Sequence, residues 1–106
     1  MPRTYSKQFI AELENANPHR AGIALAQACV KGNLPAKYVA YALEVTRMTV
    51  FSWFRGSPIR HKNLLKVEAI TELIESDTAK GILPAANTAE AKAYLEDMVG
   101  RSFDKK

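Results

Sequence analysis

Positively charged side chains are the residues of this 106-residue sequence whose chemistry stands out most clearly. Seven basic residues and a single acidic one, Glu44, lie between Lys31 and Lys66, so this segment has a net charge of +6. The residues before it carry +1 and those after it −3, which gives the +4 of the whole chain. Positive charge concentrated in one region favours a polyanionic partner, although a solvated charged surface has the same pattern.

Residues with other kinds of chemistry are few and scattered. The chain has one cysteine, Cys29, and two histidines, His19 and His61, whose positions match no zinc-ligand spacing. No paired-carboxylate, catalytic-triad or phosphate-loop arrangement is recognisable. We therefore predict a protein that is not an enzyme and that uses no metal, cofactor or small-molecule substrate. Cys29 lies among apolar helical residues and is expected to be buried.

The bulk composition is that of an ordinary globular domain, with 47% hydrophobic and 25% charged residues. No apolar run approaches the roughly 18 residues of a membrane span, so no membrane association is expected. The first 18 residues alternate between polar and apolar types, which predicts that they are not a secretory signal. The expected compartment is the cytoplasm.

The elements that must position the basic residues are expected to be helices throughout. Apolar residues recur at helical spacing, and glycines and prolines fall between the apolar stretches rather than within them. We predict an all-α fold, a compact bundle of five to six helices that forms one domain over residues 1–106. The expected helices cover about 6–16, 18–31, 35–43, 46–55, 60–79 and 87–100.

Several helix ends have recognisable signals. Asn17-Pro18 is expected to begin the second helix, and Gly32 to end it in the left-handed conformation. Asn87, followed three residues later by Glu90, resembles a capping box. The tail from Arg101 onward is expected to fray.

The segment from Val39 to Gly56 has the pattern of two short helices joined by a tight turn. A small residue in the first helix, Ala40, permits a close helix crossing, and Val45 fills the space beneath the turn. Thr46 is placed to accept hydrogen bonds from the free amides of the second helix. The residues that carry the pattern are Val39-Ala40, Val45-Thr46, Val50, Trp53 and Gly56.

This pattern resembles the helix-turn-helix of the Cro and lambda-repressor (XRE-type) family, in the compact form found in phages and mobile elements. The resemblance assigns the motif to residues 35–56 and covers residues 20–80 more loosely. The family usually has glycine at the position of Glu44, in a left-handed turn conformation. A glutamate adopts that conformation only at some cost, so a strained or altered turn is expected.

A helical wheel separates the two sides of the second motif helix. At about 100° per residue, one side holds Thr46, Val50, Trp53 and Phe54, and the other holds Met48, Phe51, Ser52 and Arg55, with Arg47 on the flank. Trp53 and Phe54 are therefore expected in the core. For Phe51, groove contact, partner contact and core packing are left open.

The resemblance implies that the outward side enters the major groove of double-stranded DNA. Arg47 and Ser52 would then hydrogen-bond base edges, and Met48 and Phe51 would touch thymine methyl groups. Basic residues around the motif would contact phosphates. The predicted DNA-binding residues are Lys37, Thr46, Arg47, Met48, Phe51, Ser52, Arg55, Arg60 and Lys62.

The function implied is that of a sequence-specific DNA-binding protein, a transcription regulator such as a repressor, in the cytoplasm of a bacterial or phage-infected cell. A homodimer is expected, because one short recognition helix rarely provides enough specificity. The helix at 87–100, with Tyr94, Leu95, Met98 and Val99, either forms the dimer contact or only covers the core. Two alternatives are a DNA-recognition subunit of a phage packaging machine, similar to a small terminase ring, and a protein-interaction module anchored by Met48 and Phe51.

Overall fold

The computed structural model describes residues 5–14 and 20–103, and all regular secondary structure in these ranges is helical. This confirms the predicted all-α bundle. The helices are α1 (Lys7–Glu14), α2 (Ala21–Gly32), α3 (Ala36–Leu43), α4 (Arg47–Phe54), α5 (His61–Ala79) and α6 (Thr88–Val99). Among them, no helix is both long and apolar enough to cross a membrane.

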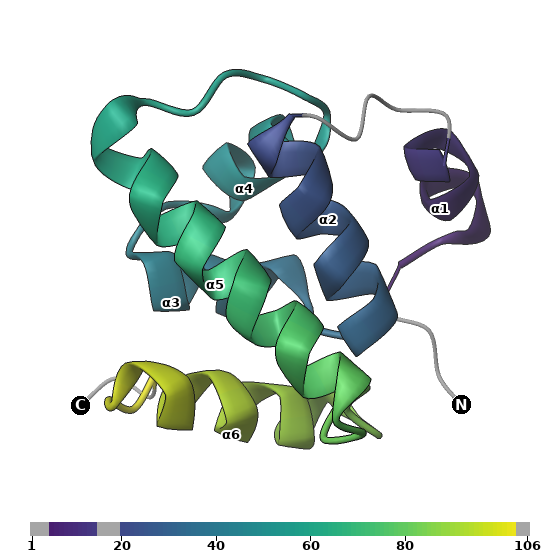
Figure 1. Cartoon of the computed structure of the whole chain (residues 1–106), viewed down its shortest axis with the longest axis vertical. Helices are drawn as coiled ribbons and strands as arrows, with labels where there is room; N and C mark the ends of the chain where they lie inside the picture. The colour runs from purple at the N-terminus through teal and green to yellow at the C-terminus, as the bar shows by residue number, and fades with distance from the viewer. Residues whose placement is uncertain (1–4, 15–19, 104–106) are drawn as a thin grey trace.

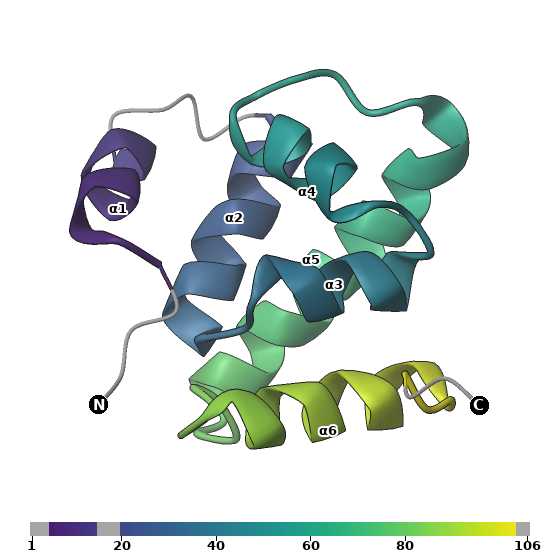
Figure 2. The ribbon, with the colours of Figure 1, turned by 180° about the vertical axis from the view of Figure 1, so that it is seen from behind.

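The longest helix, α5, crosses one face of the molecule and packs against α2 (Figure 1). The pair α3 and α4 lies on the opposite face, as the view from behind shows (Figure 2). The last helix, α6, runs along one end of the bundle and packs against α3. The first helix, α1, stands at the side of α2 (Figures 1 and 2).

One hydrophobic core joins residues from all six of these helices. Trp53 is 5% exposed and Phe54 2%, which confirms their predicted place in the core. Cys29 is fully buried, as expected, and burial raises the pKa of its thiol. The largest fully buried side chains are Phe54, Leu25, Leu34, Ile74, Leu95, Val39, Val50 and Val67.

The helix ends depart from the expected ones in the first third of the chain. The first helix begins at Lys7, after Ser6, whose Oγ accepts a hydrogen bond from the Phe9 amide at 3.1 Å. The predicted start at Asn17-Pro18 lies outside the described residues. The second helix itself begins at Ala21, because Arg20 is still in an extended conformation.

Gly32 does not end α2 in the left-handed conformation, so that prediction was wrong. Gly32 is the last helical residue and is buried, and a Cβ there would lie only 3.2 Å from the Leu83 side chain. The left-handed residue is Asn33, at φ 57° and ψ 46°. Asparagine tolerates this conformation, and its side-chain amide donates to the Ala85 carbonyl at 2.8 Å. The glycine is therefore used for close packing and the asparagine for the turn.

The C-terminal tail is ordered through Phe103, which corrects the expectation that it frays from Arg101. Gly100 ends α6 in the left-handed conformation. The chain then turns back, and the Phe103 amide donates to the Glu96 carboxylate at 2.8 Å. The Phe103 ring is 8% exposed and packs on Tyr38 and Tyr41 of α3.

The capping signal of α6 is found at the expected residues. The Asn87 side chain accepts a hydrogen bond from the Glu90 amide at 2.8 Å, and the Glu90 carboxylate accepts one from the Ala86 amide at 3.0 Å. Two apolar residues of this helix, Ala91 and Leu95, are fully buried. The apolar side of α6 is thus covered within a single chain.

Candidate nucleic-acid interface

The turn between α3 and α4 contains one residue, Glu44, in the left-handed conformation. Glu44 lies at φ 61° and ψ 42° and follows directly on α3. The amide of Val45 donates to the Ala40 carbonyl at 3.0 Å, which closes the end of α3. Of the two outcomes expected at Glu44, the turn therefore has the left-handed shape, which a non-glycine residue adopts only at some cost.

Thr46 begins α4 as its N-cap. Its Oγ1 accepts a hydrogen bond from the Thr49 amide at 3.1 Å and lies 2.8 Å from the Thr49 hydroxyl. This satisfies one of the free amides at the start of the helix. Thr46 is exposed, whereas the wheel placed it on the inward side, because a capping residue is not itself helical.

The inward side of α4 is held in the core. Val50, Trp53 and Phe54 are between 0 and 5% exposed. Ala40 of α3 is 3% exposed, as the close crossing of the two helices requires. The two motif helices are therefore fixed relative to each other and to the rest of the bundle.

Gly22 of α2 also positions α4, and sequence reasoning missed it. A Cβ at Gly22 would lie 2.2 Å from the Trp53 carbonyl oxygen, so no larger residue fits between the two backbones. The available signal was a glycine inside a helical pattern, where it is less favourable than alanine and usually has a packing reason. Gly22 sets how deeply the C-terminal end of α4 sits against α2.

The outward side of α4 exposes three of the predicted residues. Met48 is 78% exposed, and Arg47 and Arg55 are also exposed. Lys37, at the start of α3, is exposed as well, with its Nζ 5.5 Å from the centre of the Tyr38 ring. Lys37 and Arg47 line one open groove of about 360 Å³, so the structure brings these two cations to the same place.

Two other predicted residues are less accessible than the wheel suggests. Phe51 is half-buried, and its ring meets Phe54 edge-on with the ring centres 6.0 Å apart. It also lines the groove beside Arg47, so its outer part stays open to a partner. Ser52 is half-buried, and its hydroxyl donates to the Ser57 hydroxyl at 2.8 Å.

Arg60 and Lys62 lie at the beginning of α5, and both are exposed. The start of α5 and α4 are at the same end of the molecule, joined by the loop that follows Arg55 (Figure 1). His61, at the first position of α5, is exposed too.

An aromatic cluster from the N-terminal region borders this surface, and the sequence did not reveal it. The ring centre of Phe9 lies 5.4 Å from that of Tyr5 and 6.2 Å from that of Phe54. The Tyr5 hydroxyl donates to the buried Leu34 carbonyl at 2.6 Å, and burial is the main cause that raises its pKa. These contacts hold α1 next to the outward side of α4, where Tyr5, Ser6 and Phe9 form one wall of the groove.

The ordered tail contacts the turn of the motif. The Arg101 guanidinium lies 3.5 Å from the Glu44 carboxylate and donates to the Tyr41 carbonyl. Phe103 packs nearby, with its ring centre 5.5 Å from that of Tyr41 and 6.3 Å from that of Tyr38. Arg101 and Phe103 therefore support the end of α3 and the turn at Glu44.

The described ranges contain no candidate metal site beside this surface. No three His, Cys, Asp or Glu side chains gather there in a way that could hold a metal ion. Comparison of the chain with protein-family models, with curated proteins and with solved structures found no match in any of the three. The interpretation of the surface therefore depends on its own geometry and charge.

Proposed function

We propose that the protein binds double-stranded DNA in a sequence-specific manner and reads the major groove with α4, as a transcription regulator does. The observation that carries the proposal is the arrangement of α4 itself. This helix is capped by Thr46, is held in the core by Val50 and Trp53, and exposes Arg47 and Met48. A helix supported in this way fits into the major groove, which is about 12 Å wide.

The charges around α4 support a polyanionic partner. Lys37, Arg55, Arg60 and Lys62 are all exposed, and the one acidic residue of the basic segment, Glu44, is paired with Arg101. Among the described residues, none of these four cations forms an ion pair. Contacts with phosphate provide affinity and register, whereas base contacts provide specificity.

The test is a titration of the protein with a fluorescently labelled duplex of mixed sequence, at about 50 mM and about 200 mM salt. Binding at low salt that weakens steeply at higher salt is the expected result. Absence of binding even at low salt would contradict the proposal. Selection of bound sequences from a random duplex pool then reports whether one sequence is preferred and whether it is palindromic.

A pair of charge-matched variants localises the surface. Arg55→Ala removes one cation next to α4, and Lys80→Ala removes one exposed cation at the far end of α5. We expect Arg55→Ala to weaken DNA binding and to reduce, by about one, the slope of the logarithm of the binding constant against the logarithm of salt concentration. Lys80→Ala should change neither quantity. Equal effects of the two variants would show that only the net charge matters.

The exposed side chain of Met48 favours a second candidate function, which is docking of another protein on the outward side of α4. A large apolar side chain that is 78% exposed, beside a half-buried Phe51, is also suited to an apolar contact with another protein. The same titration separates the candidates, because a protein-docking surface predicts no salt-dependent binding of duplex DNA.

A further inference from the structure

One face of α5 is left uncovered by the chain and carries two exposed leucines. Leu65 is 66% exposed and Leu73 50%, and Ala69, midway between them, is exposed too. At about 100° per residue, these three residues lie within about 40° of one line along the helix, and we call them the leucine stripe. The stripe faces away from the side that α5 buries, which is formed by Val67, Ile70, Thr71 and Ile74.

Three carboxylates follow one side of the leucine stripe and form an acidic edge, which consists of Glu68, Glu72 and Glu75. All three are exposed. On the helical wheel they lie about 60° to 120° from the line of the stripe, whereas Lys66 lies about 60° to the other side. Within the described part of the chain, none of these four side chains forms an ion pair. The uncovered face of α5 thus has an apolar centre and one acidic border.

The acidic edge does not stabilise α5 itself. Glu68 and Glu72 are four residues apart, and Glu72 and Glu75 are three apart. Like charges at these spacings on a helix repel each other. Local arrangements that oppose the stability of their own element are expected mainly where a surface has a function.

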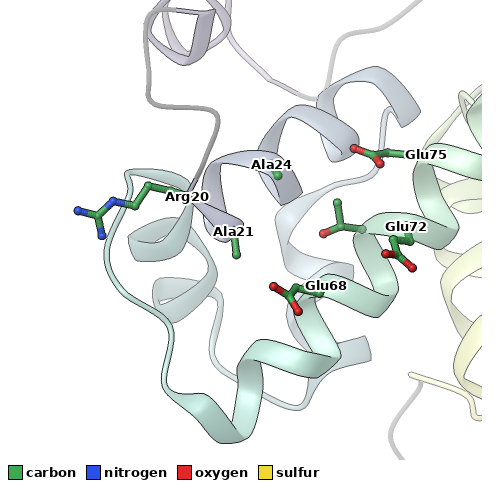
Figure 3. Close-up of a pocket in the computed structure, with 7 residues that line it drawn as sticks. Arg20, Ala21, Ala24, Glu68, Glu72 and Glu75 are labelled. Atoms are coloured by element: carbon green, nitrogen blue, oxygen red, sulfur yellow. The ribbon is translucent and has the colours of Figure 1, made fainter.

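The acidic edge borders an open groove of about 410 Å³ between α5 and α2 (Figure 3). On the α2 side the groove is lined by two small residues, Ala21 and Ala24. Arg20 is the one cation among the described residues that line it, and its side chain points away from the three carboxylates (Figure 3). The groove therefore presents carboxylates that no neighbouring cation neutralises.

We propose that this face of α5 docks a basic amphipathic helix of a partner protein. The apolar side of that helix lies on the leucine stripe, and lysine or arginine side chains along one of its edges reach into the groove toward the acidic edge. Leu65 and Leu73 are eight residues apart, about 12 Å along α5, so a partner helix of about three turns spans both. Apolar anchors at helical spacing are the usual means by which a protein binds an amphipathic helix.

Charge complementarity determines the kind of partner. A long basic side chain can lay its aliphatic stem on small residues such as Ala21 and Ala24 while its charged end reaches a carboxylate. A second copy of the chain that used the same face would instead set the acidic edge against an identical acidic edge. The face is small, so we expect a dissociation constant on the order of micromolar.

This docking is independent of the proposed DNA binding. In Figures 1 and 2, α3 and α4 lie on the opposite face of the molecule from α5. A partner on α5 therefore leaves the outward side of α4 uncovered. The protein could then bind DNA and a partner at the same time.

The test uses a synthetic amphipathic peptide of about 14 residues, which is about 21 Å long as a helix. The peptide consists of leucine, alanine and lysine, with the leucines on one side and the lysines along one edge. A fluorescent label reports its binding to the whole chain by polarisation. We expect a peptide with glutamine in place of every lysine to bind about tenfold more weakly.

A pair of charge-matched variants localises the basic contacts. Glu72→Lys reverses the middle charge of the acidic edge and should raise the dissociation constant of the lysine peptide about tenfold. Asp97→Lys makes the same change in net charge at an exposed position of α6, outside the groove, and should change it by less than about twofold. Circular dichroism checks that both variants fold.

A second pair localises the apolar contact. Leu73→Ala shortens one leucine of the stripe and should raise the dissociation constant about fivefold to tenfold. Ile82 is 60% exposed but follows the end of α5, outside the stripe, so Ile82→Ala should have little effect.

Three results would overturn the proposal. The first is absence of binding of the lysine peptide up to a concentration of about 1 mM. The second is an equal effect of variant and control in either pair, which would mean that the contact is not at this face. The third is a mass by light scattering of twice the 11.8 kDa of one chain that Leu73→Ala returns to a single chain, because the face would then be occupied by a second copy. None of these measurements contains DNA, so their failure is distinct from a failure of DNA binding.

Discussion

At the scale of single residues, Arg47 and Lys37 line the same groove but have different environments. Arg47 is the first residue of α4 and can extend along the outward side of that helix, whereas Lys37 is at the start of α3 and lies against the Tyr38 ring. Arginine offers a planar pair of donors that suits guanine, and lysine acts as a point charge on phosphate. The two cations are therefore expected to contribute to the proposed DNA binding in different ways.

We expect Arg47→Ala to cost about 1–3 kcal/mol on the preferred DNA sequence and much less on unrelated sequences. Lys37→Ala should weaken binding to all sequences alike and flatten the salt dependence. Parallel titrations with the selected site and with mixed-sequence DNA check both statements. If both variants bind as the parent does, α4 is not the reading helix.

Gly22 provides a second prediction at this scale. Gly22→Ala places a Cβ 2.2 Å from the Trp53 carbonyl oxygen, so α2 and α4 must separate, and we expect a loss of about 3 kcal/mol of stability. Gly32→Ala is the matched control in the same helix. Its Cβ would meet only side-chain ends at 3.2 Å or more, and the gain in helix propensity offsets part of this crowding.

Urea unfolding measures both variants. Equal losses of stability for Gly22→Ala and Gly32→Ala would show that the close approach of α4 to α2 does not determine the cost of a side chain at Gly22.

At the scale of elements, the turn between α3 and α4 combines an unfavourable backbone conformation with a supporting ion pair. Glu44 has φ 61°, which costs a non-glycine residue about 1–2 kcal/mol. Its ion pair with Arg101 is largely exposed, since 39% of the Arg101 side chain and 69% of the Glu44 side chain are accessible to solvent. Such pairs contribute about 0–1 kcal/mol to stability. The strain therefore outweighs the pair.

Glu44→Gly should consequently stabilise the protein by about 0.5–1 kcal/mol, since it removes more strain than attraction. Arg101→Ala in the Glu44→Gly background separates the two contributions, because the ion pair is already absent there. The free energy of unfolding in urea is the measurement. A destabilised Glu44→Gly variant would mean that the tail contact is worth more than the strain.

The same scale explains why the sequence predicted a first helix, at about 6–16, but not how α1 (Lys7–Glu14) is attached to the bundle. It has only eight residues, and its attachment consists of the rings of Tyr5, Phe9 and Phe54, which come from distant parts of the chain. No local pattern predicts which aromatic residues will meet. The attachment is relevant to the proposed function, because Phe9 of α1 lines the groove beside Arg47.

At the scale of the whole molecule, three buried or half-buried groups make the free energy of unfolding depend on pH in the alkaline range. Burial raises the pKa of Tyr5, of Cys29 and of Tyr94, and for Tyr94 a hydrogen bond to Asp77 adds to the effect. In the unfolded chain these groups lose their protons at about pH 8.5 for the thiol and about pH 10 for the phenols. Above those values the unfolded state binds fewer protons than the folded state, so stability falls as pH rises.

We therefore predict a free energy of unfolding that declines from about pH 9 upward. Cys29→Ala and Tyr94→Phe should each make the decline shallower, because each removes one group that titrates differently in the two states. Denaturant unfolding at a series of pH values is the measurement. A flat profile between about pH 8 and 11 would contradict the burial of these groups.

The sequence by itself determined the features that depend on local interactions. The helical class, the cap at Thr46 and the inward side of α4 at Val50 and Trp53 follow from residues a few positions apart, because helix periodicity and capping act within one or two turns. At Glu44 the sequence left a strained or an altered turn open. The basic segment was likewise readable from the chain alone.

Only the tertiary structure decided the features that join distant residues. Gly22 lies against Trp53, Arg101 and Phe103 fold back on α3, and Tyr5 and Phe9 wall the groove next to Arg47. The tertiary structure also decided that α6 buries its apolar side, whereas α5 leaves Leu65 and Leu73 exposed. Which apolar residues become the core depends on how all the helices pack together, and no local pattern contains that information.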